Sequence, residues 1–260
     1  MKKITHLLKK INHAIRLAVN AERFFYSQRK RYGNTFSVHI PGLNKVVFTS
    51  DPRLTHKILQ TEHHILSSSL PNPIEVLVGK GSLILLQGAA HEQERNQLKP
   101  VFQGQCLRQY SRYMQEAIAE TTVSLVDTVD AQQFMKNVTL DIILRAVFGI
   151  SSSQRRTLFA DAIFNLLNAF GPLLLLFPQA RFSLLGISPW DRFIKARSVL
   201  DELIYSEIES RKDKKNGDDI LSYLMQQPKD SINSALAPEH IRDELTTLLL
   251  AGHETTANTL

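Results

Sequence analysis

The first candidate for chemistry is the sequence His91-Glu-Gln-Glu-Arg95, in a stretch whose pattern predicts a helix. His91 and Arg95 stand four residues apart, so both side chains project from one helix face, about one turn apart. An imidazole and a forked guanidinium on one face suit a pair of carboxylates or a phosphate. The simpler interpretation is an exposed helix on which Glu92 and Glu94 form ordinary surface ion pairs.

The second candidate is the segment 251–256, Ala-Gly-His-Glu-Thr-Thr. The leucines before it cover most of the circumference of a helix, which indicates a helix that runs through a core. Inside such a helix Gly252 costs about 1 kcal/mol relative to alanine. The hydroxyls of Thr255 and Thr256 can bond back to a carbonyl three or four residues earlier. Local conflicts of this kind are typical of functional sites. The alternative is a helix that simply ends at Gly252.

Spacing excludes several other kinds of site. Two His-Glu pairs begin a zinc-protease pattern, but Arg95 and Ala257 stand where each pattern needs its second histidine. The sequence has no Walker-type phosphate loop and no nucleophile elbow of a serine hydrolase. The single cysteine, Cys106, excludes an internal disulfide framework and a multi-cysteine metal site. We expect Cys106 to be a buried or half-buried small apolar residue.

One hairpin and a series of helices must position these residues. A helix is predicted over 24–32, ending at Gly33, and two β-branched runs at 35–40 and 45–49 flank a turn at 41–44. Asp51 predicts an N-cap for a helix through residue 60. The fold class is therefore mainly α with a small N-terminal β-sheet. Further helices are predicted at 89–102, 105–128, 134–148, 154–170, 189–212, 218–227 and 238–260.

Three connections between these elements are long or strongly biased in composition. Residues 67–88 are rich in Ser, Pro and Gly and predict an irregular segment, while 171–188 predict a long apolar loop. Residues 212–219 predict a charged surface turn. A long irregular segment of the first kind is often functional.

The charge is concentrated at the N-terminus. The 260 residues carry a net charge of +6, but residues 1–31 hold nine basic side chains and one acid, so the remaining 229 residues sum to −2. This distribution disfavours a nucleic-acid-binding protein, which would spread basic residues over a folded face. Residues 1–19 form a basic amphipathic pattern that suits an anionic membrane surface or a helix packed on its own domain. We therefore divide the chain into a basic segment, 1–21, and one domain, 22–260.

Neither a secretory signal nor a good membrane span is visible. The longest stretch without charge, 162–180, is interrupted by glycine and prolines. We expect a cytoplasmic protein, with peripheral membrane contact through residues 1–19 as an option.

Taken in order, these motifs resemble the cytochrome P450 superfamily. Residues 24–33, the hairpin and the Ser-Asp-Pro at 50–52 resemble its first helix, first sheet and following helix. Residues 81–102, with H-x-x-x-R-x-x-L-x-P-x-F at 91–102, resemble its C-helix region. Residues 251–256 resemble its I-helix signature, (A/G)-G-x-(D/E)-T-(T/S).

The resemblance implies a haem with a cysteine thiolate on its iron, which uses O₂ to oxidise a small apolar molecule, and a ferredoxin or flavoprotein that supplies electrons. It implies that His91 and Arg95 hold the haem propionates and that Ala251 and Gly252 leave room for O₂. It also implies that Thr255 hydrogen-bonds oxygen and Glu254 relays protons. The implied substrate contacts are Leu83, Ile84, Leu174 and Leu248.

The same resemblance implies that a part of the family's pattern is missing. The family carries an E-x-x-R pair and the loop F-x-x-G-x-R-x-C-x-G after the I helix, whereas Cys106 precedes that helix and lacks the flanking residues. We expect the N-terminal part of a bacterial-type P450, without a metal ligand of its own and inactive alone. The alternative is a non-catalytic helical binding or membrane-associated protein built on the same frame.

Overall fold

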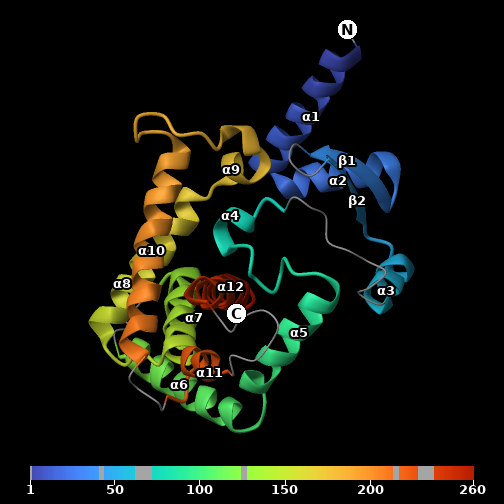
Figure 1. Cartoon of the computed structure of the whole chain (residues 1–260). Coiled ribbons are helices and arrows are strands. Elements are labelled where there is room, and N and C mark those ends of the chain that lie inside the picture. Colours follow the sequence, from blue (N-terminus) through green and yellow to red (C-terminus); the bar gives the residue numbers. More distant parts are fainter. Residues whose placement is uncertain (1, 41–43, 62–71, 124–127, 213–216, 228–236) are drawn as a thin grey trace. The chain divides into compact units, whose positions relative to one another are not determined.

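The computed structural model describes residues 2–40, 44–61, 72–123, 128–212, 217–227 and 237–260. It divides the chain into two compact units. The first unit comprises residues 1–77 and 167–194, and the second comprises residues 78–166 and 195–260. Figure 1 labels the elements, and each unit is described separately below.

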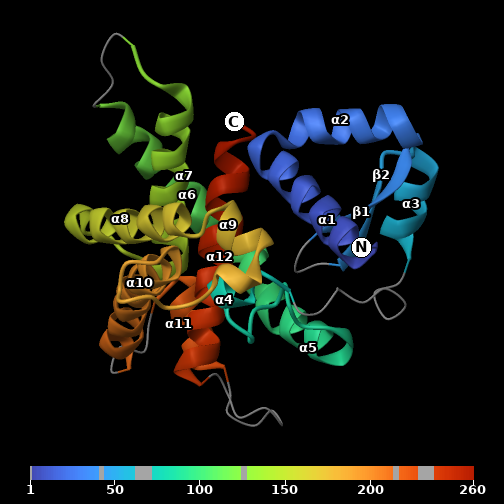
Figure 2. The same cartoon turned by 90° about the horizontal axis from the view of Figure 1, so that it is seen from above.

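The first unit is built around the predicted hairpin. Strands β1 (Thr35–Ile40) and β2 (Asn44–Thr49) pair antiparallel from Thr35 opposite Thr49 to Ile40 opposite Asn44. Most of the predicted turn, residues 41–43, lies outside the described residues. Helices α1 (Lys2–Val19) and α2 (Ala21–Tyr32) contact the hairpin, as Figure 2 shows from above. Helix α3 (Pro52–Gln60) begins at the predicted cap, where the Asp51 carboxylate accepts the Leu54 N–H at 2.9 Å.

The core of the first unit joins α1 to the hairpin. Ala14 and Phe24 are buried with Val38 and Ile40, two residues apart on one face of β1. Leu176 completes this cluster. The second half of α1 therefore packs on its own unit, as one of the two interpretations of the basic segment requires. The division of the chain after residue 21 stays a prediction.

The second unit contains most of the helices. Figure 1 shows α12 (Pro238–Ala257) beside α7 (Ala131–Phe148), and α7 also packs on α6 (Gly104–Thr122) and α11 (Ile220–Gln226). The unit also holds α5 (Gly88–Leu98), the 3-10 turn η1 (Lys99–Phe102), and most of α8 (Ser153–Ala169) and of α10 (Pro189–Arg211). Ile241, Leu245, Leu249 and Ala257 are buried along α12, which confirms a helix that runs through a core.

Two buried arginines join three helices of the second unit. Arg145 on α7 contacts Asp141 at 2.8 Å, Glu116 at 3.2 Å and Glu120 at 2.5 Å. Arg156 on α8 contacts the same Glu120 at 2.7 Å and also Asp141. Each buried guanidinium is thus matched by at least two carboxylates, as burial of a charge requires.

The predicted fold class, mainly α with a small N-terminal sheet, is confirmed. Some predicted boundaries are wrong. The stretch 171–188 is not a continuous loop, because α9 (Pro172–Leu176) and the 3-10 turn η2 (Pro178–Ala180) form there, each with a proline in its first turn. The segment 67–88 contains the short helix α4 (Glu75–Val78). Residues 62–71, 124–127, 213–216 and 228–236 lie outside the described residues, so parts of the predictions for 67–88, 105–128 and 212–219 concern undescribed chain.

Candidate functional site

One face of α12 is uncovered in an otherwise buried helix. Ala251 and Thr255 are exposed and Leu248 is half-buried, and their spacing of three and four residues places them on one face. The Thr255 hydroxyl donates to the Ala251 carbonyl at 2.5 Å, so the predicted back-bonding of this threonine is confirmed. Leu248 and Ala251 are apolar, and Thr255 adds one hydroxyl to the face. Glu254 lies next to it and is exposed.

Gly252 lets α7 approach this part of α12 closely. A Cβ built on Gly252 would lie 2.8 Å from Cδ1 of Ile143 on α7. The helix continues through Gly252 to Ala257, so the alternative that it ends at Gly252 is wrong. The glycine thus serves packing on the side of α12 turned towards α7.

His253 fixes α12 to its neighbours from the buried side. Its Nδ1 lies 3.1 Å from the Thr139 hydroxyl on α7, and its ring packs edge-on against Phe164 of α8 with centroids 5.7 Å apart. Burial lowers the pKa of His253, because the charged imidazolium would lose its solvation. His253 therefore stays neutral and structural, while Glu254 and Thr255 stay accessible.

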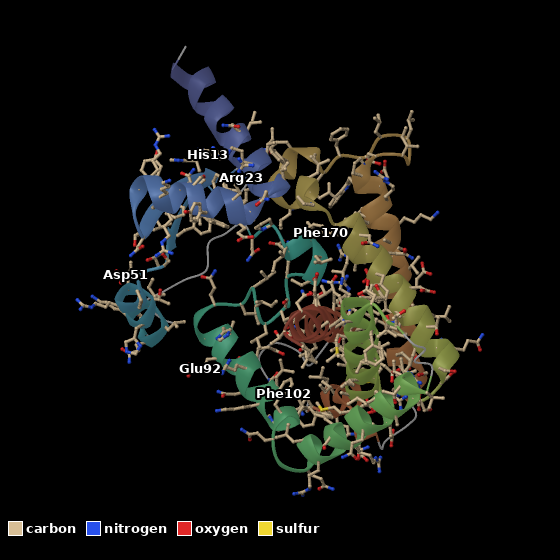
Figure 3. All side chains as sticks on the ribbon, turned by 180° about the vertical axis from the view of Figure 1, so that it is seen from behind. His13, Arg23, Asp51, Glu92, Phe102 and Phe170 are labelled. Carbon is tan, nitrogen blue, oxygen red and sulfur yellow. The ribbon has the colours of Figure 1, made fainter. Side chains whose placement is uncertain are left out.

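Helix α5 carries the predicted anion-binding pair. His91 is half-buried and Arg95 is exposed, and Arg95 makes no ion pair within the described part of the chain. Glu92 and Phe102, labelled in Figure 3, are exposed as well. Glu94, by contrast, is buried and faces α12, so the interpretation of both glutamates as surface ion pairs is wrong for Glu94.

Glu94, His240 and Glu244 form a cluster that the sequence interpretation missed. His240 Nε2 lies 3.0 Å from Glu94 Oε2, and one ligand atom from each of the three residues lies within 4.8 Å of the others. Burial raises the pKa of Glu244 to about 8, with a further contribution from the charge of Glu94. The hydrogen bond to Glu94 raises the pKa of His240. The available signal was the spacing of His240 and Glu244, four residues apart on one predicted helix.

A glycine-rich loop presses against the same part of α12. The N–H of Gly81 donates to Asp243 Oδ2 at 2.9 Å, and the N–H of Leu83 donates to Glu244 Oε1 at 2.6 Å. Gly79 has a φ of +87°, and a Cβ there would lie 1.9 Å from Oδ1 of Asp243. The two glycines therefore serve close packing on α12.

The four predicted substrate contacts lie in different units. Leu83 and Leu248 are half-buried and Ile84 is 49% exposed, all in the second unit. Leu174 belongs to the first unit, where it is buried, and its carbonyl accepts a hydrogen bond from Arg181 Nε at 3.0 Å.

Cys106 is half-buried on α6, as predicted. It lines a surface pocket of about 260 Å³ together with Tyr110 and Asp219. That pocket contains no residue of α5 or α12, so Cys106 is separate from the candidate site. Within the described residues, no helix combines the length and apolarity needed to cross a bilayer.

The fold is mainly helical with one small antiparallel sheet, and comparison with known proteins identifies its family. The family model "Cytochrome P450" matches residues 8–260, and the chain belongs to this family. The predicted resemblance is thereby confirmed.

Individual relatives agree with this assignment. "Putative cytochrome P450 135A1" of Mycobacterium tuberculosis is 33% identical over 248 residues, covering 92% of this chain and 54% of the relative. "Putative cytochrome P450 138" of Mycobacterium bovis is 30% identical over 262 residues, covering 96% and 57%. The chain thus spans about half the length of the curated relatives it matches.

Solved structures show the same fold. A retinoic acid-bound cyanobacterial CYP120A1 has a TM-score of 0.75 at 21% identity, covering 91% of this chain and 53% of that protein. A zebra fish cytochrome P450 with progesterone has a TM-score of 0.72 at 17% identity, covering 92% and 58%. At these identities the likeness concerns the fold alone.

Proposed function

We propose that these residues form one half of the pocket of a haem-dependent monooxygenase that oxidises a small apolar molecule with O₂. The observation that carries this proposal is the uncovered face of α12, formed by Leu248, Ala251 and Thr255. A buried helix that leaves Leu248, Ala251 and Thr255 uncovered suits a flat, largely apolar partner on that side. Family membership supports a haem as that partner.

The donors on α5 fit the polar edge of a haem. Arg95 is exposed and makes no ion pair in the described chain, and His91 lies one turn earlier on the same helix. A guanidinium suits a propionate carboxylate because it offers parallel N–H donors. Haem, when bound, supplies the activation of O₂.

Thr255 and Glu254 are placed to handle protons beside the open face. The Thr255 oxygen keeps acceptor capacity while its proton is held by the Ala251 carbonyl. Glu254 is exposed, so its carboxylate can exchange protons with water. In this proposal Glu254 takes up protons from solvent and passes them on towards the open face. The Thr255 hydroxyl positions the transferred proton by hydrogen bonding. Ala251 keeps the adjoining space free of side-chain bulk, while the missing side chain of Gly252 makes room for Ile143 of α7.

The proposal excludes Cys106 as the thiolate ligand of the iron. Cys106 lies on α6 in a pocket with Tyr110 and Asp219, away from the residues assigned to the haem. The thiolate would come from chain that these 260 residues do not include, so residues 1–260 alone would be inactive. The proposed electron donor is a ferredoxin or a flavoprotein. Leu83, Ile84 and Leu248 are the proposed apolar contacts for substrate in the second unit, and Leu174 is proposed from the first.

The test is haemin titration of the purified chain, followed by its absorption spectrum. Ala251→Phe fills the open face and should abolish uptake of one equivalent of haemin. Ala119→Phe, at an exposed alanine of α6, is the matched control and should leave uptake unchanged. Equal uptake by the two variants would contradict the assignment of the α12 face.

The ligand assignment has its own test. The reduced, CO-bound chain should lack a thiolate-type band, and Cys106→Ser should leave its spectrum unchanged. A thiolate-type band that disappears in Cys106→Ser would refute the exclusion of Cys106. Sequencing of the coding DNA past codon 260 should reveal an open frame with E-x-x-R and the cysteine loop; an immediate stop codon would contradict this part of the proposal.

A further inference from the structure

We infer that Glu94, His240 and Glu244 form a binding site for a divalent transition-metal ion of the Zn²⁺ type, which joins α5 to α12. His240 and Glu244 come from successive turns of α12, and Glu94 comes from the middle of α5. The inference concerns a metal other than the haem iron and does not depend on the proposed function.

The spacing of the donor atoms fits a single ion. One ligand atom from each residue lies within 4.8 Å of the others, and Nε2 of His240 lies 3.0 Å from Oε2 of Glu94. Zinc binds nitrogen and oxygen donors at about 2.0–2.2 Å, so tetrahedral neighbours stand about 3.3–3.6 Å apart. Small rotations of the three side chains therefore suffice to bring the donors to bonding distance.

Two buried carboxylate oxygens in the cluster have no hydrogen-bond partner. They are Oε1 of Glu94 and Oε2 of Glu244, on side chains of residues that are 7% and 0% exposed. Unpaired polar atoms at such burial are costly and normally find a partner. The other Glu244 oxygen already accepts the Leu83 N–H, which holds the carboxylate in place. A cation between the glutamates would satisfy both free oxygens.

With both glutamates ionised, as metal ligation requires, this cluster is short of positive charge. Arg242, the nearest arginine on α12, contacts Asp201 at 2.5 Å and Asp243 at 2.9 Å and is thereby matched. Within the cluster, the imidazole of His240 contacts Glu94 at 3.0 Å. Two glutamates therefore share one imidazole, and a divalent ion would balance their charge.

The donor set selects the class of ion. Calcium and magnesium prefer shells made of oxygen alone, whereas imidazole with carboxylates suits zinc and its neighbours in the transition series. The site has a path to solvent, because the His240 side chain is 27% exposed. Three protein ligands leave a fourth position for water or for the second oxygen of a glutamate.

The first test is calorimetric titration of Zn²⁺ into the chelator-treated, haem-free chain. We expect one tight equivalent, and His240→Gln, Glu94→Gln or Glu244→Gln should each weaken it at least about tenfold. Glu92→Gln on α5 and Glu239→Gln on α12 are exposed matched controls and should bind like the parent. Absence of the tight equivalent, or equal binding by cluster and control variants, would overturn the inference.

A second measurement needs no substitution. X-ray absorption of the one-equivalent Zn²⁺ complex should show a shell of oxygen and nitrogen with one imidazole. The chain has nine histidines and one cysteine, so adventitious sites are available. Two or more imidazoles, or a sulfur ligand, in that shell would refute the assignment even if the variants failed to fold.

Discussion

The hydroxyl of Thr139 lies 3.1 Å from Nδ1 of His253, and this contact joins α7 to the C-terminal part of α12. The groups around His253 are few: Glu254 favours its charged form, while burial and Lys136 oppose it. The imidazole is therefore held neutral at the point where α12 changes from a buried helix to one with an open face.

His253 should make the stability of the chain depend on pH. Its folded pKa lies below the unfolded value of about 6.5, so the unfolded chain binds its proton first. Its contribution is complete above pH 6.5 and is lost as the pH falls towards the folded pKa. Urea unfolding at pH 8 and pH 5.5 should show a smaller loss for His253→Gln than for the parent. His56→Gln, in the exposed helix α3, should keep the parental dependence; equal losses in all three proteins would contradict this assignment.

Gly252 and Ile143 should be energetically coupled. Gly252→Val places a branched side chain against Ile143, where even a Cβ would lie 2.8 Å from Cδ1, so we expect a loss of about 1–3 kcal/mol. Ile143→Ala, costly alone, should remove most of that penalty in the double variant. Ala251→Val, on the exposed side of the same turn, controls for a branched residue in the helix. Additive losses in a urea-unfolding cycle would refute close packing at this point.

Arg145 should contribute more to the free energy of unfolding than Glu120, one of its carboxylate partners. Arg145→Leu removes a buried guanidinium and its charge-assisted contacts, while Asp141 keeps its contact with Arg156, so we expect a cost of about 1.5–3 kcal/mol. Glu120→Gln should cost less than about 1 kcal/mol, because the Glu120 side chain is 56% exposed and its ion pairs are screened. Thermal or urea unfolding distinguishes the two. If Glu120→Gln lost as much stability as Arg145→Leu, the Glu120 carboxylate would account for most of the stabilisation, which would contradict this prediction.

Asp191 should hold the segment before α10 in place. Ser188 and Asp191 form a capping box, with Ser188 N–H to Asp191 at 3.0 Å and Asp191 N–H to the Ser188 hydroxyl at 3.0 Å. Hydrogen bonds from the Ser183 hydroxyl and the Leu184 N–H lower the pKa of Asp191, so the cap persists below the usual range for aspartate and is lost only as the pH falls through that lower pKa. Asp191→Ala should speed proteolysis within 182–188, where Leu185 is 91% exposed.

The control for this experiment is Asp161→Ala, at an exposed position of α8. It removes a carboxylate without touching the cap and should leave the rate of cleavage within 182–188 unchanged. Equal acceleration by the two variants would show that general destabilisation, and not the cap, controls this segment.

Arg95 should contribute to haem affinity in the 260-residue chain. One charge-assisted contact is worth about 1.5–3 kcal/mol, so Arg95→Ala should raise the haemin dissociation constant about 10- to 150-fold. Arg108→Ala, an exposed arginine of α6, removes the same charge elsewhere. Haemin titration monitored by absorption compares the two. If Arg108→Ala weakened binding as much as Arg95→Ala, the effect would be one of net charge and not of position.

Local secondary structure could be predicted from the sequence better than contacts between residues that are distant along the chain. The hairpin and most helices follow from periodicity and caps such as Asp51, which act within a few residues. Helix α9 was missed because Pro172 and Pro178 suggest a loop, although proline also suits the first turn of a helix.

In the candidate site too, residue types could be predicted from the sequence, but contacts between distant residues could not. Thr255, Ala251 and Gly252 could be named from their unusual types in a helix. The contact between Glu94 and His240 joins distant parts of the chain, and no spacing along the sequence reports it. That Glu94 is buried while Glu92 is exposed depends on which face of α5 meets α12, which the weakly amphipathic sequence of α5 does not specify.

Gly79 and Gly81 lie against Asp243 and His240 with no room for a side chain. In a saturation mutagenesis scan we therefore expect Gly79 and Gly81 to be among the positions that tolerate substitution least. Neither residue has a side chain that could take part in chemistry, so the intolerance would come from packing alone. Evolution and protein engineering meet the same constraint: the loop and helix α12 must vary together, so a designer who wishes to change residues 240–243 has to begin with the two glycines.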